Sequence, residues 1–176
     1  LVTTRQGSDE KMRVDYSFSY GWQSPWKTKD VLDATEYAVL MNEMNMNSGM
    51  SPIYDDPYSL GKGTDWQKEV FNYNAPVIEH QASISEGNGK MTYYLSFGYL
   101  YNEGIIGGNY NRSNYDRYSA RANTNYTFFD RSAERSWLRK FTGGVNMAYS
   151  RTTSMSIGEN SERGSILGSA VSMSPI

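Results

Sequence analysis

The sequence predicts an all-β fold, in which about five antiparallel strands form part of a transmembrane β-barrel and a long loop containing a helix separates the first two. The first observation is the alternation of apolar and polar residues over 90–128, which predicts two strands joined by a Gly/Asn-rich loop. The second is that one face of these strands is aromatic, whereas the other carries Arg117 and Arg121. A wall between lipid and a polar lumen requires these two faces.

The third observation is the rhythm of the connections between five alternating segments. These segments are 11–22, 78–85, 90–101, 116–128 and 141–152. The connection at 27–77 is too long for an ordinary hairpin, whereas 86–90 is a tight turn whose Asn-Gly suits a positive φ. Outer-membrane barrels carry long loops outside and short turns on the periplasmic side, so loop 27–77 is predicted to be extracellular.

Helical spacing replaces the strand period inside this loop. Apolar residues recur every three or four positions over 31–50, and either Asp33 or Thr35 suits the N-cap. A short helical turn is predicted at 65–71, with irregular chain around it, and a further short helix is predicted at 165–173. These segments therefore interrupt the sheet without changing the predicted fold class.

Composition excludes several classes of protein. The chain has 176 residues with 15 Tyr, 6 Phe and 4 Trp, and this aromatic content is too high for a disordered polar segment. The formal charge of -2 gives no basic field for nucleic acid. No apolar run approaches the roughly 18–20 residues of a transmembrane helix, and the absence of Cys removes disulfides and thiolate metal sites.

Six motifs, in correct order and spacing, cover nearly the whole chain. They are LVTTRQG (1–7), VDYSFSYGWQ (14–23), LDATEYAVLMNE (32–43), GTDWQKEVF (63–71), HQASISEGNGKMTYYLSFGYLYNEGIIGG (80–108) and YDRYSARANTNY (115–126). In series they resemble the SusC/RagA group of TonB-dependent outer-membrane transporters of Bacteroidetes. Two departures are Arg5-Gln6, where two basic residues are usual, and Glu86, where glycine is usual.

The resemblance implies a domain organisation and a function. Residues 1–7 would end the plug domain, and 8–176 would form the N-terminal part of a plugged, 22-stranded barrel. The chain is therefore expected to be a fragment that does not fold alone. The whole protein would sit in the bacterial outer membrane and import oligosaccharides or peptides together with a SusD-like surface lipoprotein. TonB would act through plug segments absent here, so no cofactor, enzyme activity or nucleic-acid partner is implied.

Six residues are candidate contacts for substrate or partner. In the loop, Tyr54, Tyr58, Trp66 and Tyr73 could stack on sugars or hold a peptide, or they could pack within the loop or on the lipoprotein. On the polar strand face, Arg117 and Arg121 could line a substrate path or pair with carboxylates of the plug or of a neighbouring strand.

Catalytic and metal sites find little support in the sequence. His80 is the only histidine and has no set of ligand partners nearby in sequence, so packing at a strand start is favoured. Calcium binding at Asp55, Asp56 and Asp65 lacks EF-hand spacing, and solvated loop charges are favoured. An alternative function is a soluble carbohydrate-binding β-sandwich, which would close its own core and present exposed aromatic rings to sugars.

Overall fold

The computed structural model describes residues 11–107, 112–131, 137–157 and 165–176. The predicted plug segment, 1–7, lies outside these residues. Contacts divide the chain into two compact units. The described parts of Leu1–Trp22, Pro76–Glu103 and Asn114–Ser154 form unit 1, and those of Gln23–Ala75, Gly104–Ser113 and Met155–Ile176 form unit 2.

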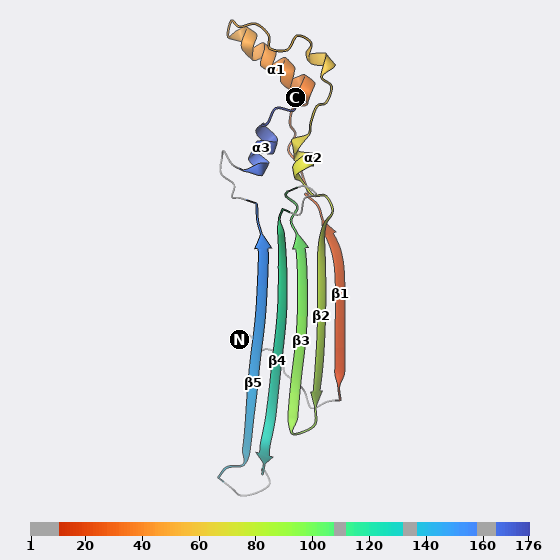
Figure 1. Cartoon of the computed structure of the whole chain (residues 1–176), viewed down its shortest axis with the longest axis vertical. Coiled ribbons are helices and arrows are strands. Elements are labelled where there is room, and N and C mark those ends of the chain that lie inside the picture. Colours follow the sequence, from red (N-terminus) through yellow and green to blue (C-terminus); the bar gives the residue numbers. More distant parts are fainter. Residues whose placement is uncertain (1–10, 108–111, 132–136, 158–164) are drawn as a thin grey trace. The chain divides into compact units, whose positions relative to one another are not determined.

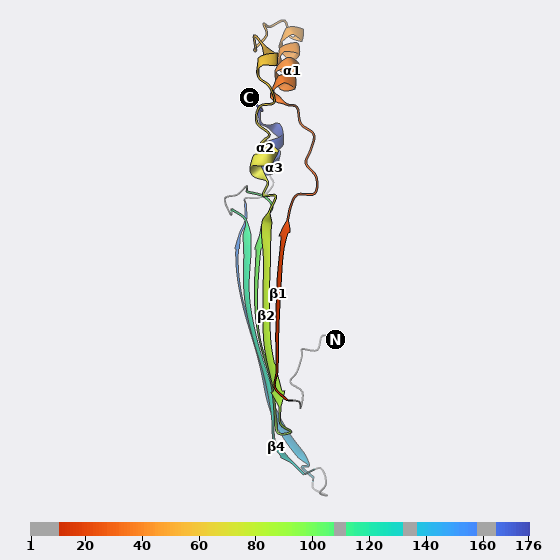
Figure 2. The same cartoon turned by 90° about the vertical axis from the view of Figure 1, so that its right-hand side faces the viewer.

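Unit 1 is one five-stranded sheet, ordered β1-β2-β3-β4-β5 as in the sequence (Figure 1). Its strands are β1 (Arg13–Gln23), β2 (Ala75–Gly87), β3 (Met91–Glu103), β4 (Asn114–Asp130) and β5 (Lys140–Met155). Strand β3 pairs antiparallel with both β2 and β4. The sheet forms a single layer where Figure 2 shows it nearly edge-on. All five predicted strands are present, and the predicted fold class is confirmed.

The turn between β2 and β3 fixes their register. The Asn88 side chain accepts hydrogen bonds from the backbone N–H groups of Lys90 and Met91, at 3.3 and 3.0 Å. Gly89 takes the positive φ, 74°, that the Asn-Gly sequence predicts. Ser83 then lies opposite Ser96, which lies opposite Arg121 on β4. A slip of one residue would move every side chain to the other face.

Unit 2 contains the helical elements. They are α1 (Ala34–Asn47), the 3-10 helix η1 (Pro57–Ser59), α2 (Trp66–Val70) and α3 (Ile166–Ser172). Of the two caps that the sequence allows for α1, the structure has Asp33, which forms a capping box with Glu36. Helix η1 was not predicted, because it is a single turn in a stretch that we expected to be irregular. No described helix has both the length and the apolar run needed to cross a membrane.

Asn42 joins α1 to the chain that follows it. Its side-chain oxygen accepts from the N–H groups of Ile53 and Tyr54 at 2.8 and 2.9 Å, and its Nδ2 donates to the Tyr54 carbonyl at 2.7 Å. The residue is buried. One amide therefore satisfies three backbone groups of a segment that has little regular secondary structure of its own.

Replacing Asn42 with Ala should loosen this segment, because each buried polar group left without a partner costs about 1–3 kcal/mol. We expect amide hydrogen exchange at Ile53 and Tyr54 in the full-length protein to accelerate at least tenfold. Asn47→Ala, at an exposed position of the same helix, is the matched control. Equal exchange in the two variants would contradict the role of Asn42.

Candidate functional site

The two faces of the sheet differ in chemistry. Large apolar side chains project from one face and are exposed, including Phe18 at 55%, Phe97 at 51% and Phe128 at 58%. Among the described residues, the buried hydrophobic side chains are all alanines: Ala34, Ala38, Ala75 and Ala170. A soluble sandwich would bury its aromatic side chains between two sheets. This sheet instead presents them outward, as strands in contact with lipid do.

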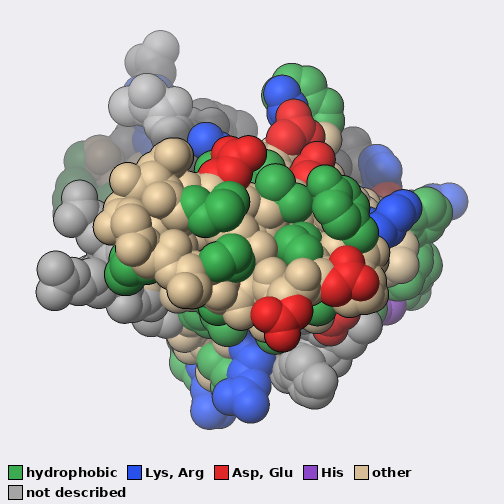
Figure 3. Space-filling view, turned by 90° about the horizontal axis from the view of Figure 1, so that it is seen from above, with side chains coloured by type: hydrophobic (Ala, Val, Ile, Leu, Met, Phe, Trp, Pro, Cys, Tyr) green, Lys and Arg blue, Asp and Glu red, His purple; other side chains and the backbone are tan. Residues whose placement is uncertain are grey.

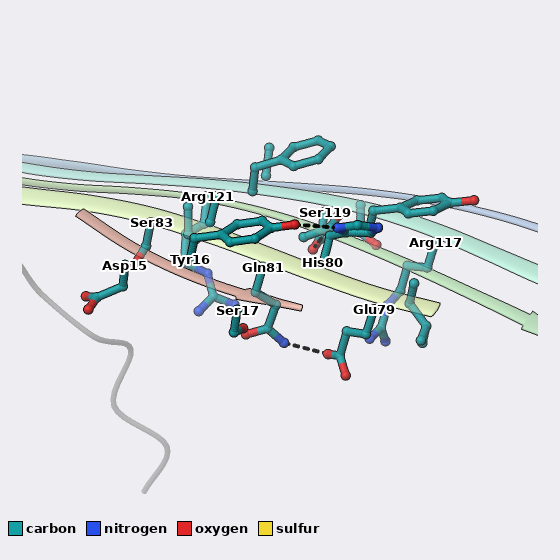
Figure 4. A pocket seen from close by; sticks show the side chains of 18 of the residues that line it. Asp15, Tyr16, Ser17, Glu79, His80, Gln81, Ser83, Arg117, Ser119 and Arg121 are labelled. Atoms are coloured by element: carbon teal, nitrogen blue, oxygen red, sulfur yellow. Dashed lines mark hydrogen bonds between the residues drawn. The ribbon is translucent and has the colours of Figure 1, made fainter. Parts of the chain in front are cut away.

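A hollow of about 810 Å³ is lined by residues of all five strands, and its lining includes the charged side chains Asp15, Glu79, Arg117 and Arg121 of the opposite, polar face. Figure 4 shows Asp15, Ser17, Glu79 and Arg117 on this side of the sheet. Gly98 leaves room for the Ser119 side chain in this lining, because a Cβ on Gly98 would lie 2.7 Å from Ser119 Oγ. The hollow is therefore a shallow polar surface with both positive and negative groups.

Arg117 and Arg121, which the alternation places on the polar strand face, both line this hollow. Arg117 lies opposite Leu100, and Arg121 lies opposite Ser96. Within the described parts of the chain, neither guanidinium has a carboxylate within salt-bridge distance, whereas Arg13 pairs with Asp15 at 2.9 Å. The guanidinium groups of Arg117 and Arg121 on β4 are thus available to a molecule or segment that contacts the polar face of the sheet.

His80 belongs to an aromatic row on the apolar face, which we call the outer aromatic row: Tyr16, Phe18, His80, Tyr99 and Tyr118. The Tyr16 hydroxyl lies 2.9 Å from His80 Nδ1 (Figure 4). The rings of Phe18 and His80, and those of Tyr99 and Tyr118, have centroids 4.8 Å apart. His80 packs within β2, and its ring contacts Tyr16 and Phe18 on β1 and Tyr99 on β3, which the sequence did not reveal.

The four candidate aromatic residues of the loop have different environments. Tyr58 is 78% exposed and Tyr73 is 38% exposed, so both rings can contact another molecule. Tyr54 is half-buried, and its backbone is held by Asn42. Trp66 is half-buried and donates its Nε1–H to the Ser174 carbonyl at 2.8 Å, which holds the C-terminal segment within unit 2.

Asp56 and Asp65, two of the three loop carboxylates considered for calcium, serve local structure. Asp65 caps α2 through the N–H groups of Gln67 and Lys68, and Asp56 accepts from the N–H of Tyr58. Within the described ranges, no three His, Asp or Glu side chains lie close enough together to hold a metal ion.

Comparison with curated proteins finds two partial relatives. The TonB-dependent receptor SusC of Bacteroides thetaiotaomicron is 29% identical over 150 residues, which are 83% of this chain and 14% of SusC. The TonB-dependent receptor P3 of Formosa agariphila is 25% identical over 171 residues, 97% of this chain and 15% of that receptor. The chain thus spans about one seventh of the length of these relatives. No family model matches the chain.

The fold is similar to part of a solved structure, that of the RagAB peptide importer in the "closed-closed" state. The TM-score is 0.55 at 21% sequence identity, over 86% of this chain and 19% of that chain. The predicted resemblance to SusC/RagA-type TonB-dependent receptors is confirmed. Such receptors are outer-membrane transport proteins rather than enzymes, which agrees with the predicted localisation.

A charge on the apolar face should impair insertion into the membrane. Val145 lies on the exposed apolar face of β5. Its neighbour Asn146 lies on the opposite, polar face, together with Thr142. The Thr142 hydroxyl is hydrogen-bonded to that of Thr127. Val145→Arg should cost about 2–4 kcal/mol near the bilayer midplane. We expect less folded, heat-modifiable full-length protein in the outer membrane. Asn146→Arg is the matched control and should insert normally. An equal loss of folded protein in both variants would contradict the assignment of Val145 to the apolar face and Asn146 to the polar face.

Two aromatic substitutions should separate structure from contact in the loop. Trp66→Ala removes the bond to Ser174 and should raise hydrogen exchange in the segment 173–176, whereas Tyr58→Ala should leave exchange in unit 2 unchanged. A loss of ligand or partner binding in Tyr58→Ala could then be attributed to a lost contact. Faster exchange throughout unit 2 in Tyr58→Ala would show that its ring is structural instead.

Proposed function

We propose that this chain forms part of the barrel wall of a TonB-dependent outer-membrane active transporter of the SusC/RagA type. The observation that carries the proposal is the exposed aromatic face of the sheet, opposite a polar face that carries Arg117 and Arg121. In this assignment 1–7 ends the plug domain, 8–176 is the N-terminal part of the barrel, and loop 27–77 is extracellular. The similarity to TonB-dependent receptors supports it.

The transporter would take up oligosaccharides or peptides together with a SusD-like surface lipoprotein. The solved neighbour is described as a peptide importer, which supports a peptide as one class of cargo. The exposed rings of Tyr58 and Tyr73 can stack on a sugar or cover a peptide side chain. Movement of cargo through the barrel would draw energy from TonB acting on the plug, so this segment would supply walls and contact surfaces.

Uptake by the full-length protein should depend on TonB. We expect a strain that lacks the gene for this receptor to lose growth on one oligosaccharide or on a peptide mixture. A strain that lacks TonB should lose growth on the same nutrient while keeping the receptor in its outer membrane. Re-expression of each deleted gene is the control.

A receptor found in the soluble fraction, or uptake that persists without TonB, would overturn the proposal. The cargo is identified by comparing oligosaccharides and peptides as sole nutrients. The lipoprotein is tested separately, by copurification with the detergent-extracted receptor and identification of the bound protein by mass spectrometry.

A further inference from the structure

The apolar face of unit 1 contains a smaller hollow of its own, of about 520 Å³. Its lining is made by four members of the outer aromatic row and by two further residues: Tyr16, His80, Tyr99, Tyr118, Ala82 and Phe97. His80 lies opposite Tyr99, and in the next row Ala82 lies opposite Phe97. Because Ala82 projects only a methyl group among these rings, an apolar space remains beside it.

The surroundings of this hollow are uncharged. No side chain in its lining is a carboxylate, a lysine or an arginine. The exposed surface of unit 2 differs, because its hydrophobic side chains are interspersed with Asp and Glu, as Figure 3 shows from the end that carries α1. A polar group in the lining of the hollow therefore lies in apolar surroundings, where a hydrogen bond is strong and an unused donor is costly.

The lining contains such a group, the hydrogen-bonded pair of Tyr16 and His80. The Tyr16 hydroxyl lies 2.9 Å from His80 Nδ1. A hydroxyl carries one hydrogen and a neutral imidazole one N–H, and only one of these two hydrogens is used between the partners. Within the described parts of the chain, neither side chain makes another hydrogen bond. Whichever atom donates, the pair therefore has one donor left for a molecule in the hollow.

A carboxylate marks the end of the apolar band next to the hollow. Asp116 shares the apolar face of β4 with Tyr118, two residues away, and it accepts a hydrogen bond from the Tyr99 hydroxyl at 3.1 Å. A carboxylate is costly within hydrocarbon, whereas aromatic rings are typical of the boundary between lipid and water. The outer aromatic row thus lies near this boundary, with Ala82 and Phe97 on the side away from Asp116.

We propose that the hollow binds one acyl chain of a membrane lipid, whose ester carbonyl accepts a hydrogen bond from the Tyr16–His80 pair and whose head group carries an ammonium. The ester groups of a lipid lie at the boundary between hydrocarbon and water, the depth inferred for the pair. A carbonyl oxygen accepts and cannot donate, so it complements the remaining donor. The inference rests on the proposed function, which places this face in the bilayer.

The chemistry of the site argues against other lipids. A plain hydrocarbon chain would fill the space but leave the donor of the Tyr16–His80 pair without an acceptor. A head group with phosphate and no amine would bring like charge towards Asp116, which an ammonium would attract. The polar end of the lipid thus decides which lipid is bound, and the acyl chain supplies apolar contact.

Three lipids with the same chain length test the proposal on the delipidated full-length receptor in detergent. They are diacyl phosphatidylethanolamine, its dialkyl ether analogue, which lacks the ester carbonyl, and diacyl phosphatidylglycerol, which lacks the ammonium. Native mass spectrometry measures the lipid bound to each receptor. We expect the diacyl ethanolamine lipid to bind about tenfold more tightly than its ether analogue, the equivalent of one hydrogen bond, and more tightly than the glycerol lipid. Equal binding of all three, or retention of lipopolysaccharide alone, would overturn the proposal.

Variants then locate the preference. Tyr16→Phe and His80→Phe keep a ring but break the pair, and both should remove the preference for the ester lipid. Ala82→Leu fills the hollow and should weaken binding of all three lipids. Tyr126→Phe is the matched control, because Tyr126 is exposed on the apolar face of β4 but does not line the hollow. It should behave as the unchanged receptor does. A preference that survives in Tyr16→Phe and Ala82→Leu, or that Tyr126→Phe also removes, would contradict the site.

These results are distinguishable from failure of the proposed function. If the receptor is folded in the outer membrane and uptake depends on TonB, but the ester lipid has no advantage, the lipid site is wrong and the transporter assignment stands. If the receptor is soluble, the transporter assignment fails first, and the placement of the hollow in the bilayer fails with it.

Discussion

Unit 1 depends on one constraint: the backbone N–H and C=O groups of each strand must pair with those of its neighbours. In such a sheet the side chains alternate between the two faces. In lipid no water can satisfy a free N–H or C=O group, so each strand must bond to neighbours on both sides. Strands β2, β3 and β4 have such neighbours, and β1 and β5 are the edges of the described sheet. The proposed barrel supplies their missing partners, and the period of two then sorts aromatic residues to lipid and polar residues to the lumen.

Most of the fold could be predicted because its signals are local. Alternation alone located the five strands, although every strand runs past its predicted bounds at one end at least, since pairing continues into polar residues such as Asn114 and Asp130. The cap of α1 could have been decided, because Asp33 has Glu36 three residues later and Thr35 has Ala38. Helix η1 could not have been predicted, since three residues are too few to show a helical periodicity of apolar residues.

The site was less predictable, because its contacts join residues far apart in the chain. The sequence favoured packing of His80 at a strand start, but its bond to Tyr16 crosses 64 positions and depends on how β1 pairs with β2. Likewise, Trp66 was a candidate for ligand contact on its residue type alone, whereas its Nε1–H reaches Ser174, 108 positions away. Tyr58 is exposed whereas Trp66 is half-buried, and this difference becomes visible only once the fold is known.

The polar face carries a further consequence for the proposed transporter. Arg13 neutralises Asp15 on its own strand, but Arg117 and Arg121 lie on the polar face without a carboxylate in reach among the described residues. Two arginines beside a closed plug would lose water, and a desolvated charge without a partner is costly. In that setting the plug surface against β4 must present carboxylates, or the space must stay wet. In either arrangement this stretch of the barrel wall would be polar, in contrast to the aromatic face on the other side of the sheet.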